Sequence, residues 1–342
     1  EENSDWIVYL YDTKGTYDNF NDDTYTTFGE TSNGELRDVT IKNDWVTWVD
    51  TTAYNSCTSS SFVFKGYQVS TNALFTIDER MGDLGYSRYG NLIAYTAYDD
   101  TGDRDIYLFD LENGTKRCIC SNEEDQLMPY IWGNVIVWSD GRNFETPYRD
   151  IYMYNLQTEI ETRITTTQGM ETWPITNGEW IVYLWASSNN ASKAIKKYNI
   201  STGVESIIAS NSEVEYTFLI RDINSSFLAW SEDSSEKLYI HNLSSNENTL
   251  IENSPNSIWS AELNQSAQPQ LVYHLPSETD DFSWGDVYGY DLTTKAKYPI
   301  RTAGKTWCEV SLNKTTNTVV MTSFGVNSLN PSECDVSLAF IP

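Results

Sequence analysis

Residues 127–166 decide the fold; they read LMPYIWGNVIVWSDGRNFETPYRDIYMYNLQTEIETRITT. The pattern predicts four short strands, over residues 129–132, 135–138, 151–154 and 162–165. Gly133 and Asn134 form a tight turn between the first two strands, because both residues tolerate positive φ. The apolar run 135–138 is typical of a strand that is covered on both faces. One such sheet cannot bury both of its faces alone, so it needs neighbours of its own kind.

Copies of this unit recur along the chain. Apolar copies of the second strand end at residues 48, 95, 138, 183, 230, 273 and 321, so successive copies lie 43 to 48 residues apart. The third strand repeats with the same period. A period in the forties with four strands per unit indicates a β-propeller. We therefore expect an all-β fold, a seven-bladed β-propeller of four-stranded antiparallel blades.

The repeats also predict the organisation of the chain. We expect one domain over residues 1–342, with blades at about residues 36–79, 84–121, 127–166, 171–209, 214–252, 258–301 and 306–342. Residues 1–35 are expected to be an N-terminal closing segment, so that strands from both chain ends complete the last blade. Eight blades are the minor alternative, because residues 1–35 could hold half a blade.

The charge balance restricts the partners. The chain has 22 Lys and Arg against 49 Asp and Glu, a net charge of −27. We expect no nucleic acid partner, because phosphate binding requires clustered basic residues. No apolar run reaches membrane-spanning length, so we expect no membrane insertion. The chain starts without Met, which is expected of a mature product whose signal peptide has been removed.

Five cysteines occur, none with zinc-finger spacing: Cys57, Cys118, Cys120, Cys308 and Cys334. Their places in the repeat put them near one rim of the blades. We expect a disulfide between Cys308 and Cys334, and one from Cys57 to Cys118 or Cys120, in an oxidising compartment. The alternative is a set of buried free thiols.

The loops differ in length. Links between the second and third strands are long, as at residues 50–61, 97–104, 139–149, 275–284 and 323–333. Antiparallel alternation places these links on one face of the blades, together with the links between blades. We call it the long-loop face and expect function there, because long loops on a rigid scaffold commonly carry it.

Two segments resemble a known repeat. The run Ser139-Asp-Gly-Arg-Asn, followed by Asp150-Ile-Tyr-Met-Tyr-Asn-Leu, resembles the TolB-type, WD-repeat-like propeller repeat, and residues 105–111 carry the same signature. The repeat is most similar to those of secreted surface proteins of methanogenic archaea and some bacteria. The resemblance implies an extracellular or cell-surface protein with a protein- or glycan-binding face.

A lyase resemblance is weaker. Oligogalacturonate lyases are similar in architecture, and that family relies on a histidine-rich metal site. This chain has only His241 and His274. His241 aligns with aromatic positions of other repeats and is expected in the core, whereas His274 ends a second strand and could reach the long-loop face.

Aromatic and charged residues on the long loops form the candidate ligand site. Rings that stack on sugars and charges that bond hydroxyl groups suit a glycan, and the same residue types are enriched in protein interfaces. The alternative is ordinary loop packing. The candidate ligand-binding residues are Asp140, Arg142, Phe144, Tyr148, Arg149, Tyr98 and Trp284; no catalytic residue is predicted.

The loop at residues 99–105 is rich in carboxylates. Asp99, Asp100, Asp103 and Asp105 are candidate ligands for Ca²⁺, which takes carboxylate and carbonyl oxygens; it is the one cofactor we consider. The alternative is a solvated loop whose Asp side chains accept local backbone hydrogen bonds. Asp105, Asp150 and Asp286 share one repeat position, which favours a structural role.

Seven Asn-x-Ser/Thr sequons make glycosylation a further expectation: Asn113, Asn190, Asn199, Asn224, Asn242, Asn264 and Asn313. Six of them, all except Asn190, fall on the short turns opposite the long-loop face. Turns are rich in Asn and Ser in any case.

Together these patterns favour a non-catalytic binding or scaffold module that takes a protein, a glycan or its own copies at the long-loop face. One alternative is a carbohydrate-active enzyme, a polysaccharide lyase or glycoside hydrolase using loop carboxylates. Another is a structural subunit of a surface layer or filament.

Overall fold

The computed structural model describes residues 6–12, 24–31, 36–42, 44–51, 62–143, 148–212, 218–232, 236–258, 260–276, 285–313, 318–324 and 334–340, with side chains described only from residue 36 to residue 300. Every regular element in these ranges is a β-strand, as the repeats predict. In the same ranges, no helix is long and apolar enough to cross a membrane. The chain divides into two compact units, residues 1–166 and 167–342. The expectation of one propeller domain stays a prediction.

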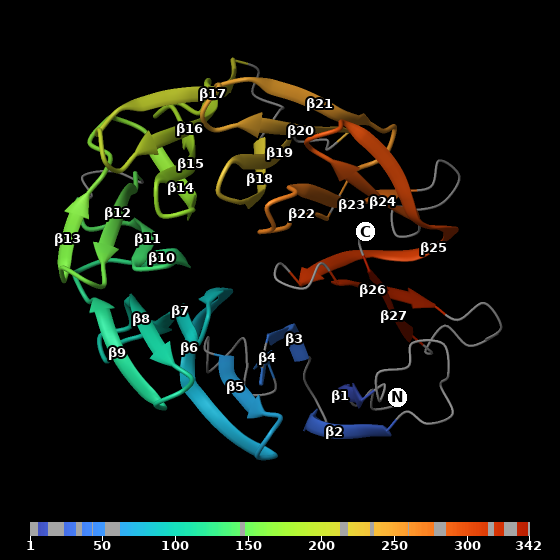
Figure 1. The fold of residues 1–342 in the computed structure, drawn as a ribbon. Coiled ribbons are helices and arrows are strands. Elements are labelled where there is room, and N and C mark those ends of the chain that lie inside the picture. Colours follow the sequence, from blue (N-terminus) through green and yellow to red (C-terminus); the bar gives the residue numbers. More distant parts are fainter. Residues whose placement is uncertain are drawn as a thin grey trace. The chain divides into compact units, whose positions relative to one another are not determined.

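The first unit contains three antiparallel sheets (Figure 1). A two-stranded sheet pairs β1 (Trp6–Asp12) with β2 (Thr24–Thr31). A seven-stranded sheet runs through β3 (Leu36–Lys42), β4 (Trp45–Asp50), β5 (Phe62–Gln68), β6 (Ala73–Tyr89), β7 (Leu92–Tyr98), β8 (Arg104–Asp110) and β9 (Thr115–Cys120). A four-stranded sheet contains β10 (Gln126–Trp132), β11 (Val135–Asp140), β12 (Asp150–Asn155) and β13 (Ile160–Arg163).

The second unit repeats the four-stranded pattern. One sheet contains β14 (Met170–Thr176), β15 (Trp180–Ala186), β16 (Lys193–Asn199) and β17 (Glu205–Asn211). The next contains β18 (Phe218–Ile223), β19 (Phe227–Glu232), β20 (Lys237–Asn242) and β21 (Asn248–Asn253). A six-stranded sheet runs through β22 (Ala261–Leu263), β23 (Gln270–Pro276), β24 (Gly285–Asp291), β25 (Ala296–Asn313), β26 (Thr318–Phe324) and β27 (Cys334–Phe340).

Two long strands each join two repeats that we predicted as separate blades. β6 pairs with β5 through its first half and with β7 through its second half. It is therefore the fourth strand of one repeat and the first strand of the next. β25 does the same between β24 and β26. We call the successive four-stranded repeats blades 1 to 6, starting at β3; β25 to β27 supply three strands of blade 7.

The predicted stretch matches its sheet closely. Predicted strands 135–138 and 151–154 lie within β11 and β12, whereas the predicted fourth strand, 162–165, is shifted two residues toward the C-terminus from β13. β10 starts at Gln126, three residues earlier than predicted, because a bulge between Leu127 and Tyr130 extends the pairing. Met128 in that bulge has φ 58°, a left-handed conformation that costs a non-glycine residue roughly 1–2 kcal/mol.

The core lies between consecutive blades. One cluster joins blade 2 to blade 3, with Ile106 and Cys120 on one side and Ile136, Trp138 and Tyr152 on the other. Each large apolar side chain buried here contributes about 1.5–3 kcal/mol. A similar cluster joins blades 5 and 6. The blades of these two pairs thus bury each other's faces, as the repeat argument requires.

The predicted closure stays a prediction. Among the described residues, β1 pairs with β2 and β27 pairs with β26.

Candidate functional site

Asp140, one of the predicted ligand-binding residues, lies in the core of blade 3. It ends β11, whose side chains are all buried, and its own side chain is 0% exposed. An ionised carboxylate at such a position needs hydrogen-bond donors and a counter-charge. Trp138 Nε1 donates to Oδ2 at 2.7 Å, and the backbone N–H of Arg142 donates to Oδ1 at 2.9 Å.

Arg142 supplies the counter-charge. Its Nε and Nη2 donate to the two oxygens of Asp140 at 2.9 and 2.6 Å, and its Nη1 donates to Glu161 Oε1 at 2.5 Å. The guanidinium carbon lies 4.1 Å from the ring centroid of Tyr152. With its amide oxygen facing the guanidinium, Asn122 accepts from Nη1 at 2.9 Å and from Nη2 at 3.2 Å. Burial alone would lower the pKa of Arg142, but the bonds to Asp140 and Glu161 outweigh it and raise the pKa above its usual range.

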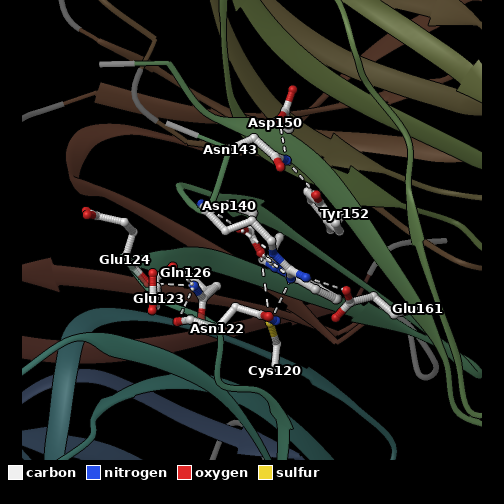
Figure 2. Close-up of polar contacts among 12 residues, drawn as sticks. Cys120, Asn122, Glu123, Glu124, Gln126, Asp140, Asn143, Asp150, Tyr152 and Glu161 are labelled. Carbon is white, nitrogen blue, oxygen red and sulfur yellow. Dashed lines mark hydrogen bonds and ion pairs between the residues drawn. The ribbon is translucent and has the colours of Figure 1, made fainter. Parts of the chain in front are cut away.

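Cys120 completes this network from the fourth strand of blade 2. Figure 2 shows Cys120, Asp140 and Glu161 converging from three strands. Arg142 Nη2 lies 2.9 Å from the Cys120 sulfur. Burial raises the pKa of the Cys120 thiol to about 12, so the thiol stays protonated at neutral pH and is a poor nucleophile.

The expected bridge from Cys57 is wrong at both of its possible partners. Cys118 and Cys120 are free thiols, and Cys120 is enclosed by the Arg142 network. Cys57 itself lies outside the described residues. β26 separates the strands of Cys308 and Cys334, so two strand spacings, about 9.5 Å, lie between them. A disulfide needs Cα atoms within about 7 Å. The backbone therefore does not favour the Cys308–Cys334 bridge, which stays a prediction.

The loop after β11 is tethered to the head of β12. Asn143 Nδ2 donates to Asp150 Oδ2 at 2.9 Å and to the Tyr152 hydroxyl at 2.6 Å. Arg163 Nη2 lies 2.8 Å from Asp150 Oδ2. The Tyr152 ring stacks on Trp138 at 6.0 Å between centroids. These contacts fix the start of the long loop.

A second ion-pair group joins blades 2 and 3 at the long-loop face. Arg104 donates to Asp125 through Nε at 3.0 Å and Nη2 at 2.5 Å, and Arg149 Nη2 lies 3.8 Å from the same carboxylate. Burial would raise the pKa of Asp125, but the two arginines outweigh it and hold the pKa below its usual value. The Asp125 carbonyl also accepts from Gly141 N at 2.9 Å.

The structure thus brings together part of the predicted ligand set. Asp140, Arg142 and Arg149 lie at the boundary between blades 2 and 3, and Tyr98 lies opposite Arg104 in the β7–β8 register. Tyr148 precedes Arg149 and is half-buried, whereas Phe144 and Trp284 lie outside the described residues. Four exposed residues at this boundary, Asn122, Glu123, Glu124 and Asn143, are called the rim.

Several residues of the boundary were not predicted to belong to the ligand site. Cys120, Asn122, Asp125 and Glu161 meet Arg104 or Arg142 from positions about 20 residues away. The available signal was the clustering of arginines in the sequence. Seven of the ten lie between residues 80 and 163. A buried Arg needs acceptors for its N–H groups, and a carboxylate is a common one.

The acidic loop at residues 99–105 is held by its own hydrogen bonds. Asp99 Oδ1 accepts from the backbone N–H groups of Thr101, Gly102 and Asp103 at 2.8, 2.8 and 2.9 Å. Asp100 pairs with Arg80 at 2.7 Å on the surface. In the described ranges no group of three or more His, Cys, Asp or Glu side chains has a metal-binding arrangement. Calcium binding here stays a prediction.

Asp105 differs from the other members of that loop. It is buried at the head of β8, and burial, followed by the charges of Asp99 and Asp103, raises its pKa to about 6. A carboxyl group with such a pKa exchanges its proton near neutrality.

Both histidines are fully buried. His241 lies in the core of blade 5, as predicted, and burial lowers its pKa to about 4. His274 lies behind β24, where a Cβ on Gly285 would meet its Nε2 at 2.7 Å. The expectation that His274 could reach the long-loop face is therefore wrong, because β24 covers it.

Three of the predicted glycosylation sites are inaccessible. Asn224 and Asn264 are 3% and 0% exposed, and Asn224 Nδ2 donates to the Asn264 carbonyl at 3.1 Å. Asn199 is buried as well. Their side chains hold the short turns together, so the nitrogen that a glycan would use is already enclosed. Asn113 and Asn190 are exposed and Asn242 is half-buried, whereas the side chain of Asn313 lies outside the described set.

Comparisons with known proteins establish the fold. No family model and no curated protein matches this chain. The β-propeller domain of the Trilobed protease from Pyrococcus furiosus matches with a TM-score of 0.59 and 14% identity, over 90% of this chain and 93% of that one. An oligogalacturonate lyase in complex with manganese matches with a TM-score of 0.56 and 11% identity, over 87% and 86%. TolB from Acinetobacter baumannii matches with a TM-score of 0.46 and 12% identity, over 90% and 76%. At these identities the first two show the fold alone: the chain is an all-β protein with the β-propeller fold.

Proposed function

We propose that this β-propeller is an extracellular or cell-surface binding module that takes a protein or a glycan at the long-loop face, over the boundary of blades 2 and 3. The observation that carries the proposal is that Asp140 and Arg142 use their hydrogen-bonding groups within the protein. Asp140 accepts from Trp138, the Cys120 thiol and both the backbone and the guanidinium of Arg142, and Arg142 donates to Asp140, Glu161 and Asn122. These charges serve the scaffold.

These internal hydrogen bonds support a binding role because they hold the loops at this face rigid. Loops that are fixed before a partner arrives lose less conformational entropy on binding. Arg104 and Asp125 fasten blade 2 to the link before blade 3, and Asn143 fastens the loop after β11. Above them the rim presents amides and carboxylates to solvent. Amides and carboxylates suit the hydroxyl groups of a glycan or the polar edge of a protein.

The test compares two faces of the same two blades. The rim variant carries Glu123→Gln and Glu124→Gln; the control carries Glu112→Gln and Glu159→Gln, which lie on the opposite short turns. Binding to an array of neutral and acidic oligosaccharides, and to intact cell envelopes, is measured for each. We expect the rim variant to lose at least about tenfold in affinity, or about 1.4 kcal/mol, and the control to bind like the wild type. Equal binding by all three proteins would contradict the proposal.

A carbohydrate-active enzyme is the second candidate, and Asp105 is the observation that favours it. A carboxyl group with a pKa of about 6 can act as a general acid near neutral pH. Release of reducing ends or unsaturated products from a panel of polysaccharides, lost in Asp105→Asn, would support this candidate. The absence of turnover in the wild type would contradict the enzyme candidate, and the binding module would remain as the proposal.

Assembly into a surface layer or filament is a further proposal from the acidic charge and the exposed strand edges of blades. Sedimentation and electron microscopy with and without Ca²⁺ test it together with the calcium prediction. A Ca²⁺-dependent rise in melting temperature that Asp99→Asn removes would support a site in the 99–105 loop. Exposed Asn113 and Asn190 are the sequons to examine for glycans in native material.

A further inference from the structure

Two basic side chains are buried together where blade 4 meets blade 5. Lys197 lies on β16, the third strand of blade 4, and His241 lies on β20, the third strand of blade 5. Lys197 is 3% exposed and His241 is 0% exposed. The Lys197 amine donates to the carbonyl of Leu243, just after β20, at 2.5 Å. The amine therefore bridges the two blades.

The hydrogen bonds of His241 define its tautomer. Nδ1 lies 3.0 Å from Asn248 Oδ1, and Asn248 Nδ2 donates to the carbonyl of Ile208 at 2.8 Å. Because that amide nitrogen is used as a donor, Oδ1 is the acceptor and Nδ1 carries the imidazole proton. His241 Nε2 is then a buried acceptor, and it has no hydrogen-bond partner among the described residues.

Among the described residues, no carboxylate compensates the positive charge of Lys197. Lys197 Nζ lies 4.6 Å from the ring centroid of Trp180, a neutral partner. Among the described residues, Lys197 is the charged group that acts on His241; Asn248, which bonds to the ring, is neutral, and Trp230 donates to Asn248. Burial, followed by the charge of Lys197, lowers the pKa of His241 to about 4, and burial lowers the pKa of Lys197.

We propose that Lys197 and His241 make the contact between blades 4 and 5 an acid-operated joint. A proton that binds Nε2 adds a second positive charge close in the chain to Leu243, whose carbonyl holds the Lys197 amine, and both side chains are buried. Two like charges in such a site repel strongly, because little solvent screens them. Separation of the two blades exposes both groups to water and relieves the repulsion.

The direction of the pH effect follows from linkage. The pKa of His241 in the closed joint, about 4, lies below its ordinary value of about 6.5. The opened form therefore binds the proton first. The contribution of the joint to stability is complete above about pH 6.5 and is lost as the pH falls toward about 4.

The repeat provides matched variants. The position of His241 holds Tyr154 in blade 3 and Tyr198 in blade 4, so an aromatic ring fits it. His241→Phe keeps a ring and removes the titration. Lys197→Met keeps the aliphatic chain and removes the second charge. The first variant should abolish the acid effect, and the second should weaken it.

Hydrogen exchange with mass spectrometry tests the joint, with rates corrected for the intrinsic effect of pH. Between about pH 7 and about pH 5, we expect protection in residues 193–211 and 237–253 to fall at least about tenfold more than in residues 104–120 and 150–163. His241→Phe should remove this difference. A difference that persists in His241→Phe, or the absence of any difference in the wild type, would overturn the proposal.

Imidazole NMR of the wild type gives an independent readout that needs no folded variant at position 241. The chain has two histidines, so His274→Gln assigns both signals. We expect the His241 ring to remain neutral, with its proton on Nδ1, until the protection in blades 4 and 5 is lost. A ring that protonates reversibly near about pH 6.5 while protection is intact would also overturn the proposal.

Discussion

Blades 2 and 3 each bury an aspartate at the same repeat position, but the charged neighbours of the two aspartates have opposite signs. Asp105 heads β8 and Asp150 heads β12, and they are 2% and 7% exposed. Asp150 has Arg163 at 2.8 Å and Asn143 at 2.9 Å. Asp105 instead feels the negative charges of Asp99 and Asp103, and its pKa is raised to about 6 by burial and then by these charges.

The strand register explains the difference. Arg163 lies opposite Tyr152 in blade 3, whereas Cys118 lies opposite Tyr107 in blade 2. The repeat therefore fixes where the carboxylate lies and how deeply it is buried. The neighbouring strand, which varies between blades, decides whether it has a cation. Burial is a property of the fold, and charge compensation is a property of the individual blade.

The largest expected effect is in blade 3. Arg142→Met should destabilise the protein by about 3–5 kcal/mol, because it leaves the fully buried Asp140 without its counter-charge. Urea unfolding of the full chain measures the loss. Arg117→Met is the control: Arg117 pairs with Glu159 on the surface, and its loss should cost less than about 1 kcal/mol. Similar costs for the two variants would break the distinction between buried and surface pairs.

A smaller effect is expected at the paired aspartate. Asp150→Asn should cost about 1–2 kcal/mol, because Arg163 loses its counter-charge and Asn143 loses a charged acceptor. The same urea assay measures it at neutral pH. A neutral or stabilising result would show that Asp150, like Asp105, is not compensated by its neighbours.

The smallest effect is expected from adding a cation near Asp105 in blade 2. Cys118→Arg places a guanidinium at the register position of Arg163. It should stabilise the protein by about 0.5–1 kcal/mol near pH 7, since Cys118 is exposed and a partly solvated ion pair contributes little. Cys118→Met, which adds bulk without charge, is the control. If both variants gain equally, packing rather than charge is responsible.

Much of the fold could be predicted from the sequence because strand periodicity is local. Predicted strands 135–138 and 151–154 fall within β11 and β12. The continuity of β6 and β25 across two blades could not be predicted, because polar residues between two apolar runs read as a break. The bulge at Met128 was missed as well, since positive φ is not expected for that residue.

The site was predicted in composition but not in role. Asp140 and Arg142 were expected to face a ligand, yet they face each other and Glu161, which lies on another strand. Sequence gives no distance between residues 120, 142 and 161, so the saturation of Arg142 was not visible. The same limit applies to Asn224 and Asn264: a sequon specifies a turn residue, and only packing decides its exposure.

The pH dependence of Asp105→Asn tests the central claim most directly. The pKa of Asp105 in the folded chain, about 6, lies above the ordinary value of about 3.9, so the wild type loses stability as the pH rises from about 4 through about 6. Asn at this position removes that loss. We predict that the difference in unfolding free energy between Asp105→Asn and the wild type grows in favour of the variant, by about 2 kcal/mol, between about pH 4 and about pH 7.5. A difference that stays constant with pH, or that favours the wild type at high pH, would contradict the account.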